Sequence, residues 1–378
     1  MARNSARLEA EPVSRADRNL DVLAFMPLQR GPPAGDYLQA VDPGLDWKTI
    51  ESEHLYVHYA DGNKAFAERA LSIAEAAHAR LTRELNWNPV EKTHIVLSDE
   101  TDQPNGYATP VFFNRTVLYL APPTSVNTLE DFDDWMSTLI FHEYTHIVHL
   151  DKGDDSPEYL RNVFGRFFLL FPNLYQPTWV TEGLATHKET YTERGIGRGQ
   201  STMYATMMRE EVVNGVQPIS HVNLPVSTWP AGTTRYLYGV YFMEFLAEQY
   251  GEDKIQQWVE EYSNNLIPFF INTAASQSLG KNLTPLWEEY QQWLTDRFQP
   301  QIDAINADGV KAGARISMAA YRTASVRVLA GDSGDDVYYV NESGYQRANL
   351  VRIDADGNSE QLIELNGSAN IDLHQQAG

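Results

Sequence analysis

The chain has 378 residues and no cysteine, which excludes disulfide scaffolds, thiol catalysis, zinc fingers and iron–sulfur clusters. Its 29 basic and 51 acidic residues give a net charge of −22, which disfavours nucleic acid and anionic lipid as partners. The length predicts more than one domain, and a hydrophobic content of 43% is sufficient for a sizeable core.

Two features bear on the compartment. No run of 18 apolar residues occurs, so no membrane-spanning helix is predicted. The first residues lack the apolar centre of a signal peptide. This N-terminus fits a cytoplasmic protein, or an exported protein whose signal has been removed.

The chain begins with a polar stretch, residues 1–45, which we expect to be an extended lead-in. Alternating apolar residues then predict a first strand, and Ala- and Leu-rich spacing predicts a long helix after it. We interpret DQPNGYATP, at 102–110, as a turn-rich loop between two further strands. The predicted elements are a strand at 55–60, a helix at 63–85, and strands at 93–99 and 116–122.

Helical spacing dominates from about residue 130 to residue 300. The predicted helices cover 130–150, 178–191, 200–214, 235–250, 252–264 and 284–297. After about 312, short β-rich runs alternate with Gly, Asp and Asn turns, which is typical of an antiparallel meander. These runs are RVLAG at 327–331, DVYYV at 336–340, NLVRI at 349–353 and QLIEL at 361–365. They amount to about one propeller-type blade.

The motif that indicates chemistry is His142-Glu143-Tyr144-Thr145-His146, an H-E-x-x-H. Residues four apart lie on one face of a helix, so His142 and His146 can meet one Zn²⁺ ion. Glu143 lies beside them, where it can take a proton from metal-bound water. The surrounding apolar residues follow the helical period, without Pro or Gly inside the motif.

A catalytic zinc site needs a third protein ligand, and three residues are candidates. His149 lies two turns from His142, about 10 Å along the axis, which is too far for one ion. Asp151 follows at the helix end. Glu182 lies in W-V-T-E-G-L-A on a second helix, and a crossing helix gives it the best geometry. Thr186 and Glu189, on the same helix face, are candidates to orient a ligand imidazole, or are solvated helix positions.

H-E-Y-T-H followed by W-V-T-E-G-L-A resembles the gluzincin, or peptidase MA-like, zinc metallopeptidases over about residues 45–300. The resemblance implies an α+β, thermolysin-like two-lobed domain at 46–300, with an N-terminal mixed sheet lobe and a mainly helical C-terminal lobe. The segment 301–378, a linker and partial all-β segment, is similar to TolB-like propeller blades. Such blades follow domains of this kind in some exported bacterial proteins, so the resemblance implies a periplasmic or otherwise exported location.

The resemblance also implies site roles. Zn²⁺ would be held by His142, His146 and Glu182, and Glu143 would be the base. R-Y-L-Y-G-V-Y-F, at 235–242, is similar to a Y-x-x-G motif whose Tyr stabilises the oxyanion, and Tyr236 matches this Tyr and Gly239 the Gly. Tyr238 is the second choice, and core packing is the alternative for both tyrosines.

The implied reaction is zinc-dependent hydrolysis of a peptide or protein substrate. The chain departs from aminopeptidases in the 36-residue gap from His146 to Glu182, and it lacks a G-A-M-E-N-like stretch to bind an α-amine. The residues at 105–115 lie where such an edge strand would fall, but they include no acid. We therefore expect an endopeptidase. The alternatives are a zinc hydrolase for esters or other amides, and a degenerate peptidase-like protein that binds partners through its propeller segment.

Overall fold

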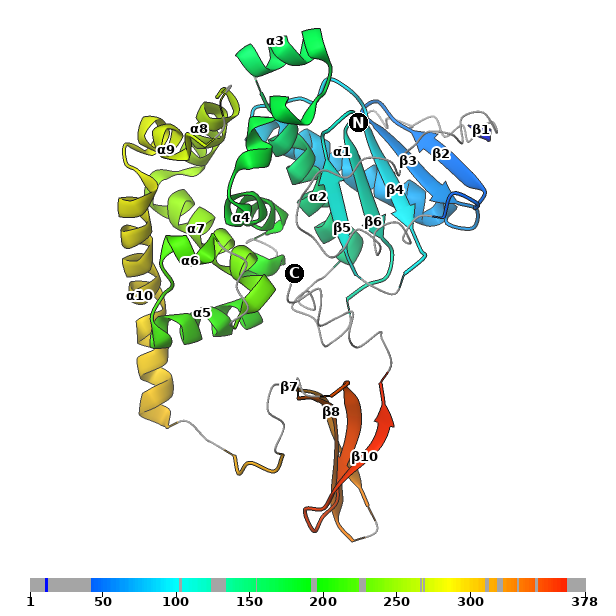
Figure 1. The fold of residues 1–378 in the computed structure, drawn as a ribbon, viewed down its shortest axis with the longest axis vertical. Coiled ribbons are helices and arrows are strands. Elements are labelled where there is room, and N and C mark those ends of the chain that lie inside the picture. Colours follow the sequence, from blue (N-terminus) through cyan, green and yellow to red (C-terminus); the bar gives the residue numbers. More distant parts are fainter. Residues whose placement is uncertain are drawn as a thin grey trace, which may run out of the picture.

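The computed structural model describes most of the chain between residues 42 and 365. The described residues are 11–12, 42–101, 104–123, 134–153, 155–191, 196–223, 229–265, 267, 269–309, 313–317, 322–331, 333–343 and 346–365. They form an α+β fold with a mixed sheet, a following set of helices and a C-terminal antiparallel sheet (Figure 1). Most of the expected lead-in at 1–45 lies outside the described residues.

The N-terminal sheet has the strand order β1-β2-β3-β4-β6-β5. Strands β3, β4 and β6 run parallel, while β1, β2 and β5 are antiparallel to their neighbours. Among the described residues, β5 is therefore the edge strand on one side of the sheet. The strands are β1 (Glu11–Pro12), β2 (Trp47–Glu51), β3 (Leu55–Ala60), β4 (Thr93–Ser98), β5 (Gly106–Thr109) and β6 (Arg115–Tyr119).

Two helices, α1 (Lys64–Glu84) and α2 (Trp135–Asp151), pack against one face of this sheet and against each other (Figure 1). Burial alternates along β3: Leu55, Val57 and Tyr59 are buried, while the residues between them are half-buried. The buried residues point to one face of the sheet, which is the face that the helices cover. Helix α2 contacts β5 and β6, so the edge of the sheet lies beside the H-E-x-x-H helix.

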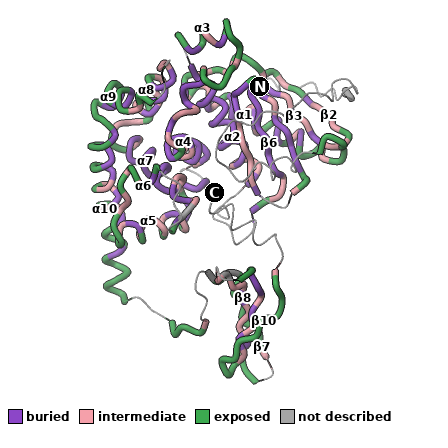
Figure 2. The backbone as a smooth tube through the Cα atoms, viewed as in Figure 1, coloured by how far each residue is buried: buried purple, intermediate pink, exposed green. Residues whose placement is uncertain are grey.

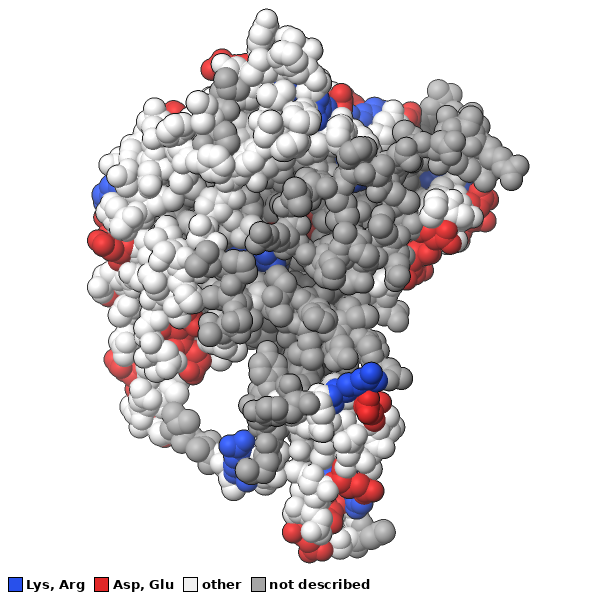
Figure 3. Space-filling view, viewed as in Figure 1, with Lys and Arg blue, Asp and Glu red and all other residues white. Residues whose placement is uncertain are grey.

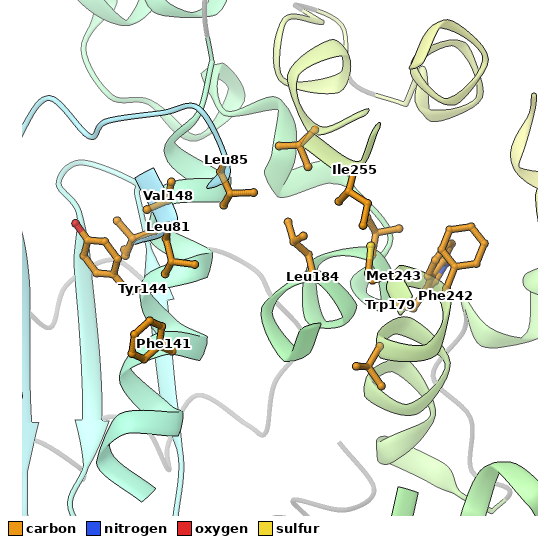
Figure 4. Close-up of a cluster of buried hydrophobic side chains, with 14 of the residues drawn as sticks. Leu81, Leu85, Phe141, Tyr144, Val148, Trp179, Leu184, Phe242, Met243 and Ile255 are labelled. Atoms are coloured by element: carbon orange, nitrogen blue, oxygen red, sulfur yellow. The ribbon is translucent and has the colours of Figure 1, made fainter. Parts of the chain in front are cut away.

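The helices after α2 continue the same hydrophobic core. They are α3 (Asp155–Phe164), α4 (Thr178–Glu189), α5 (Thr202–Asn214), α6 (Ile219–Val222), α7 (Thr234–Tyr250), α8 (Glu252–Ser263), α9 (Ile271–Leu279) and α10 (Leu283–Asp308). Figure 4 shows Tyr144 and Val148 of α2, Leu184 of α4 and Phe242 of α7 among the buried side chains of this core. The first sheet and the helical part therefore share one interior, with α4 packed between α2 and α7.

The C-terminal sheet has the order β10-β9-β8-β7, with every pair antiparallel. Its strands are β7 (Arg322–Ala330), β8 (Asp335–Glu342), β9 (Asn349–Ile353) and β10 (Ser359–Glu364). Its core is small, with Tyr339, Val351 and Ile353 buried, while every residue of β10 is exposed (Figure 2). The meander expected from the sequence is confirmed, as an open four-stranded sheet.

Two expectations were wrong in their boundaries. The stretch 102–110 is not only a loop, because Gly106–Thr109 form β5 and pair with β6. The limit at residue 300 falls inside α10, which continues to Asp308 because Phe298 and Ile302, one turn apart, stay buried. Strand β2 and helices α3, α6 and α9 were not predicted. Among the described residues, no helix has the length and apolar composition to cross a bilayer.

Candidate metal centre

Helix α2 carries His142, Glu143 and His146 into the interior. The helix begins after Asp134, whose side chain accepts a hydrogen bond from the Ser137 amide. Every residue from Leu139 to Asp151 is buried, because α1 and the sheet cover one side of α2 and α4 the other. The motif therefore lies on a helix that is fixed on several sides.

Three potential donor atoms converge on one point. The Nε2 atoms of His142 and His146 are 3.2 Å apart, and Oε2 of Glu182 lies 3.2 Å from the first and 3.3 Å from the second. A tetrahedral ion with bonds of about 2.0–2.1 Å places its donor atoms about 3.3 Å apart. The donor set therefore fits a divalent cation, and these three residues could hold one.

Glu182 reaches this point because α4 crosses α7 at two glycines. A Cβ built on Gly183 would lie 2.5 Å from backbone atoms of Gly239, and a Cβ on Gly239 would lie 2.3 Å from the Trp179 carbonyl oxygen. Only glycine permits this approach. The crossing brings Glu182, which precedes Gly183, towards the same site as Tyr236, which precedes Gly239 by one turn.

His142 is oriented from its other ring nitrogen. Its Nδ1 lies 2.8 Å from Oε2 of Glu189, which is buried at the end of α4. Glu189 in turn accepts hydrogen bonds from the Arg198 guanidinium at 2.7 Å through each carboxylate oxygen. A carboxylate on Nδ1 leaves Nε2 of His142 free to bind an ion. Of the two orienting candidates, the structure therefore places Glu189 on a ligand. Thr186 has no side-chain hydrogen bond among the described residues.

The charges of this network shift its titration. Burial opposes the ionisation of Glu189, but the charge of Arg198 and its hydrogen bonds lower the pKa of Glu189 to about 2. Burial likewise opposes charge on His142, yet its bonds to Glu182 and Glu189 raise the pKa of His142 to about 9. For Glu182, His146 and His142 overcome the burial effect and hold its pKa well below the usual range. The carboxylates of Glu182, Glu189 and the neighbouring Glu143 outnumber the single guanidinium of Arg198, so the site favours a cation.

Glu143 lies next to the donor cluster and against the edge strand. It is buried, and a Cβ on Gly106 of β5 would lie 3.1 Å from Oε1 of Glu143. Its Oε2 atom has no hydrogen-bond partner among the described residues. Burial raises the pKa of Glu143, against the opposing effect of His142 and His146. The carboxylate is thus held beside the donor cluster with one oxygen available to a ligand or to water.

The two candidate tyrosines of α7 have different surroundings. The ring of Tyr236 is half-buried, with its centroid 6.3 Å from that of His142 and 4.8 Å from the Arg198 guanidinium carbon. Burial, followed by the charge of Glu182, raises the pKa of Tyr236 to about 12, so its hydroxyl stays protonated. Tyr238 is fully buried and donates to Glu211 instead, stacked on Trp287. Tyr238 is a core residue, and only Tyr236 lies at the site.

No protein-family model matches the chain, and no curated protein matches it either.

The two remaining candidates for a third ligand lie outside the donor cluster. His149 is fully buried, and burial together with the nearby His146 lowers its pKa to about 3. Asp151 accepts hydrogen bonds from Trp87 at 2.9 Å and from Arg166 at 2.7 Å. Its carboxylate is committed to this structural network, so Glu182 is the third residue of the cluster.

Arg198 is the site residue that the sequence analysis missed. It begins a short 3-10 helix, η6 (Arg198–Gln200), and its side chain is buried. Gly197 has a φ of 89°, and a Cβ there would lie 2.5 Å from Cα of Thr190. The flanking glycines in G-R-G were the available signal, because they let this loop lie against the end of α4.

Proposed function

We propose that this protein is a zinc-dependent peptidase that acts as an endopeptidase. The observation that carries the proposal is the convergence of His142, His146 and Glu182 within 3.3 Å, with Glu143 beside them. Imidazole nitrogens and one carboxylate suit zinc, and three protein ligands leave a fourth position for the reaction. Zinc bound there would supply a Lewis acid that polarises a carbonyl group and lowers the pKa of water.

The chain's own residues would supply the proton transfers. Glu143 has an oxygen without a protein partner and a raised pKa, so it is suited to accept a proton and to return it to the leaving amine. Tyr236 keeps its proton up to a high pH, and it can donate a hydrogen bond to the developing oxyanion. Arg198 holds Glu189, which fixes the His142 ring, and so acts as a positioning residue.

An extended peptide is the substrate that the edge strand supports. Strand β5 is the last strand of the sheet and lies against α2 at Glu143. A peptide that added to this edge would place its backbone carbonyls along the helix that carries the donors. This arrangement favours a peptide over a small ester, and it supports the gluzincin resemblance. The thermolysin-like pair of lobes and export to the periplasm are parts of the same proposal.

A second function is a peptidase-like protein that has lost activity and binds partners. Its support is the C-terminal sheet, whose open edges and exposed strand β10 could pair with another chain or with further blades of a propeller. The retained donor cluster and the buried Glu143 favour the enzyme, because an inactive protein has no need to keep a buried carboxylate without a partner.

Digestion of denatured casein, followed by mass spectrometry of the products, tests the proposal. We expect internal cleavage by the parent and a loss of about 10³-fold or more in Glu143→Gln, because the base is removed while the ligands stay. Glu158→Gln, an exposed position on α3, is the matched control and should cleave like the parent. Equal cleavage by Glu143→Gln would exclude Glu143 as the base, and an absence of internal cleavage would contradict the endopeptidase.

A further inference from the structure

The segment between α2 and α4 exposes an unusual number of large apolar side chains. Helix α3 projects at the top of the molecule in Figure 1, and the short 3-10 helix η3 (Phe168–Leu170) contacts it. We call their exposed side chains the apolar tip, and each of them is at least 43% exposed. The apolar tip consists of Tyr159, Val163, Phe164, Phe167, Phe168 and Leu169. Such a cluster on a protein surface indicates a binding surface.

The two arginines of this segment, Arg161 and Arg166, are directed inward, whereas the apolar tip is exposed. The guanidinium of Arg161 donates to the Asp151 carbonyl at 2.6 Å and to the Gly153 carbonyl at 2.7 Å. Arg166 donates to the Asp151 carboxylate at 2.7 Å, and both guanidinium groups lie within 5.1 Å of the ring centre of the buried Phe171. The hydrogen bonds of these two arginines fix the base of the segment and leave the apolar tip exposed.

The acidic residues of α3, Asp155 and Glu158, lie in its first turn, and no acid follows them in the rest of the segment. From residue 159 to residue 181 there is no Asp or Glu, although the chain has 51 acids and a net charge of −22. Figure 3 shows the projecting end largely without charged atoms in this view. Acidic side chains among inserted aromatics would resist transfer to an apolar phase, and their absence from residues 159–181 lowers this cost.

We propose that the apolar tip inserts into the surface of a lipid bilayer with uncharged headgroups. A projecting set of aromatic and aliphatic side chains fits the boundary between headgroups and acyl chains, where Phe and Tyr are favoured. The surplus negative charge of the chain disfavours anionic lipid, so zwitterionic lipid is the matching surface. A second copy of the chain is the competing occupant, and a net charge of −22 on each copy opposes that contact. This inference does not depend on the metal centre.

Flotation of the full chain with phosphatidylcholine vesicles tests the proposal. We expect the parent to float with the vesicles, including at 0.5 M salt, and the variant Val163→Ser/Phe164→Ser/Phe168→Ser to bind at least about tenfold more weakly. The matched control is Phe66→Ser/Val90→Ser/Val213→Ser, which removes apolar groups that are equally exposed elsewhere. The control should float like the parent, and both variants should keep the casein cleavage of the parent.

A second readout covers the case in which the triple variant fails to fold. The chain has no cysteine, so Phe164→Cys and Phe66→Cys each carry a single environment-sensitive label. When vesicles are added, the fluorescence emission of the label at position 164 should shift to shorter wavelength, and that of the label at position 66 should not change. Three results would overturn the proposal: no vesicle binding by the parent, equal binding by the tip variant, or a parent dimer in sedimentation that the tip variant converts to monomer.

Discussion

Gly183 of α4 and Gly239 of α7 lie so close that a methyl group on either would strike the backbone of the other helix. One glycine follows Glu182, and the other lies one turn after Tyr236. The contact therefore sets the distance between the proposed third metal ligand and the proposed oxyanion donor. It explains why Glu182 and Tyr236, 54 residues apart in the sequence, belong to one site.

Gly239→Ala should disturb stability and the site together. Because the new Cβ would meet the Trp179 carbonyl oxygen at 2.3 Å, α4 and α7 must move apart. We expect a loss of about 1–3 kcal/mol in the free energy of unfolding, measured by urea denaturation, and weaker zinc binding. Gly313→Ala is the control, since a Cβ at Gly313 has no neighbour within 4 Å. Parent-like stability of Gly239→Ala would show that the helices do not require this contact.

Arg198→Gln should weaken metal binding without removing a ligand. It leaves the Glu189 carboxylate buried without its guanidinium, so Glu189 no longer fixes His142. We expect a roughly 10–100-fold loss of zinc affinity in competition with a chelator. Arg209→Gln, at a half-buried position of α5 where the guanidinium bonds to Gln301 instead, should bind zinc like the parent. Arg198→Lys keeps the positive charge, so partial recovery of zinc affinity in this variant would show that Arg198 positions Glu189 and that the loss in Arg198→Gln is not caused by unfolding.

Substitution of Tyr236 and of Tyr238 should have different effects, the first on activity and the second on stability. Tyr236→Phe removes the proposed oxyanion donor, and we expect kcat for peptide cleavage to fall about 10²–10³-fold with zinc content unchanged. Tyr238→Phe removes a buried hydrogen bond to Glu211 and should cost about 1 kcal/mol of stability while activity is kept. The reverse pattern, with activity lost only in Tyr238→Phe, would contradict the assignment.

The fold could be predicted from the sequence where hydrophobic periodicity was strong. The strand at 55–60 and the helix at 63–85 match β3 and α1 to within a residue, because each buries one regular face. Strand β5 was missed because Gly106 and Pro110 look like turn residues, whereas Gly106 is needed for the close approach of Glu143. The predicted helix at 284–297 ends too early, because the buried Phe298 and Ile302 continue α10 through Pro300 to Asp308.

The candidate site was predicted in part. H-E-x-x-H and E-G-x-A are short motifs that can be recognised without a structure, so His142, His146 and Glu182 could be predicted as ligands. The structure brings these three residues together. Arg198 could not be named, because it reaches the site through a loop whose path depends on Thr190 and on the end of α4. Choosing between Tyr236 and Tyr238 also needed the structure, since both lie on the same helix and only their neighbours differ.

Acid should destabilise the protein through His149. This ring is buried and its pKa is lowered to about 3, below the unfolded value of 6.5. Between these values the unfolded chain binds the proton and the folded chain does not, so stability falls as the pH is lowered from about 6.5 towards 3. The contribution is about 1.4 kcal/mol per pH unit at most. In urea denaturation between pH 6.5 and pH 4, His149→Gln should show a shallower loss, and an unchanged slope would contradict this origin.

The zinc content of the purified chain tests the central claim most directly. After exchange into metal-free buffer and addition of one equivalent of zinc, we expect about one tightly bound ion per chain in the parent and in Glu143→Gln, measured by atomic emission. His146→Ala should lose it, whereas His149→Gln should keep it, since His149 lies outside the donor cluster. Absence of bound zinc in the parent, or parent-like zinc content in His146→Ala, would contradict the proposed metal centre.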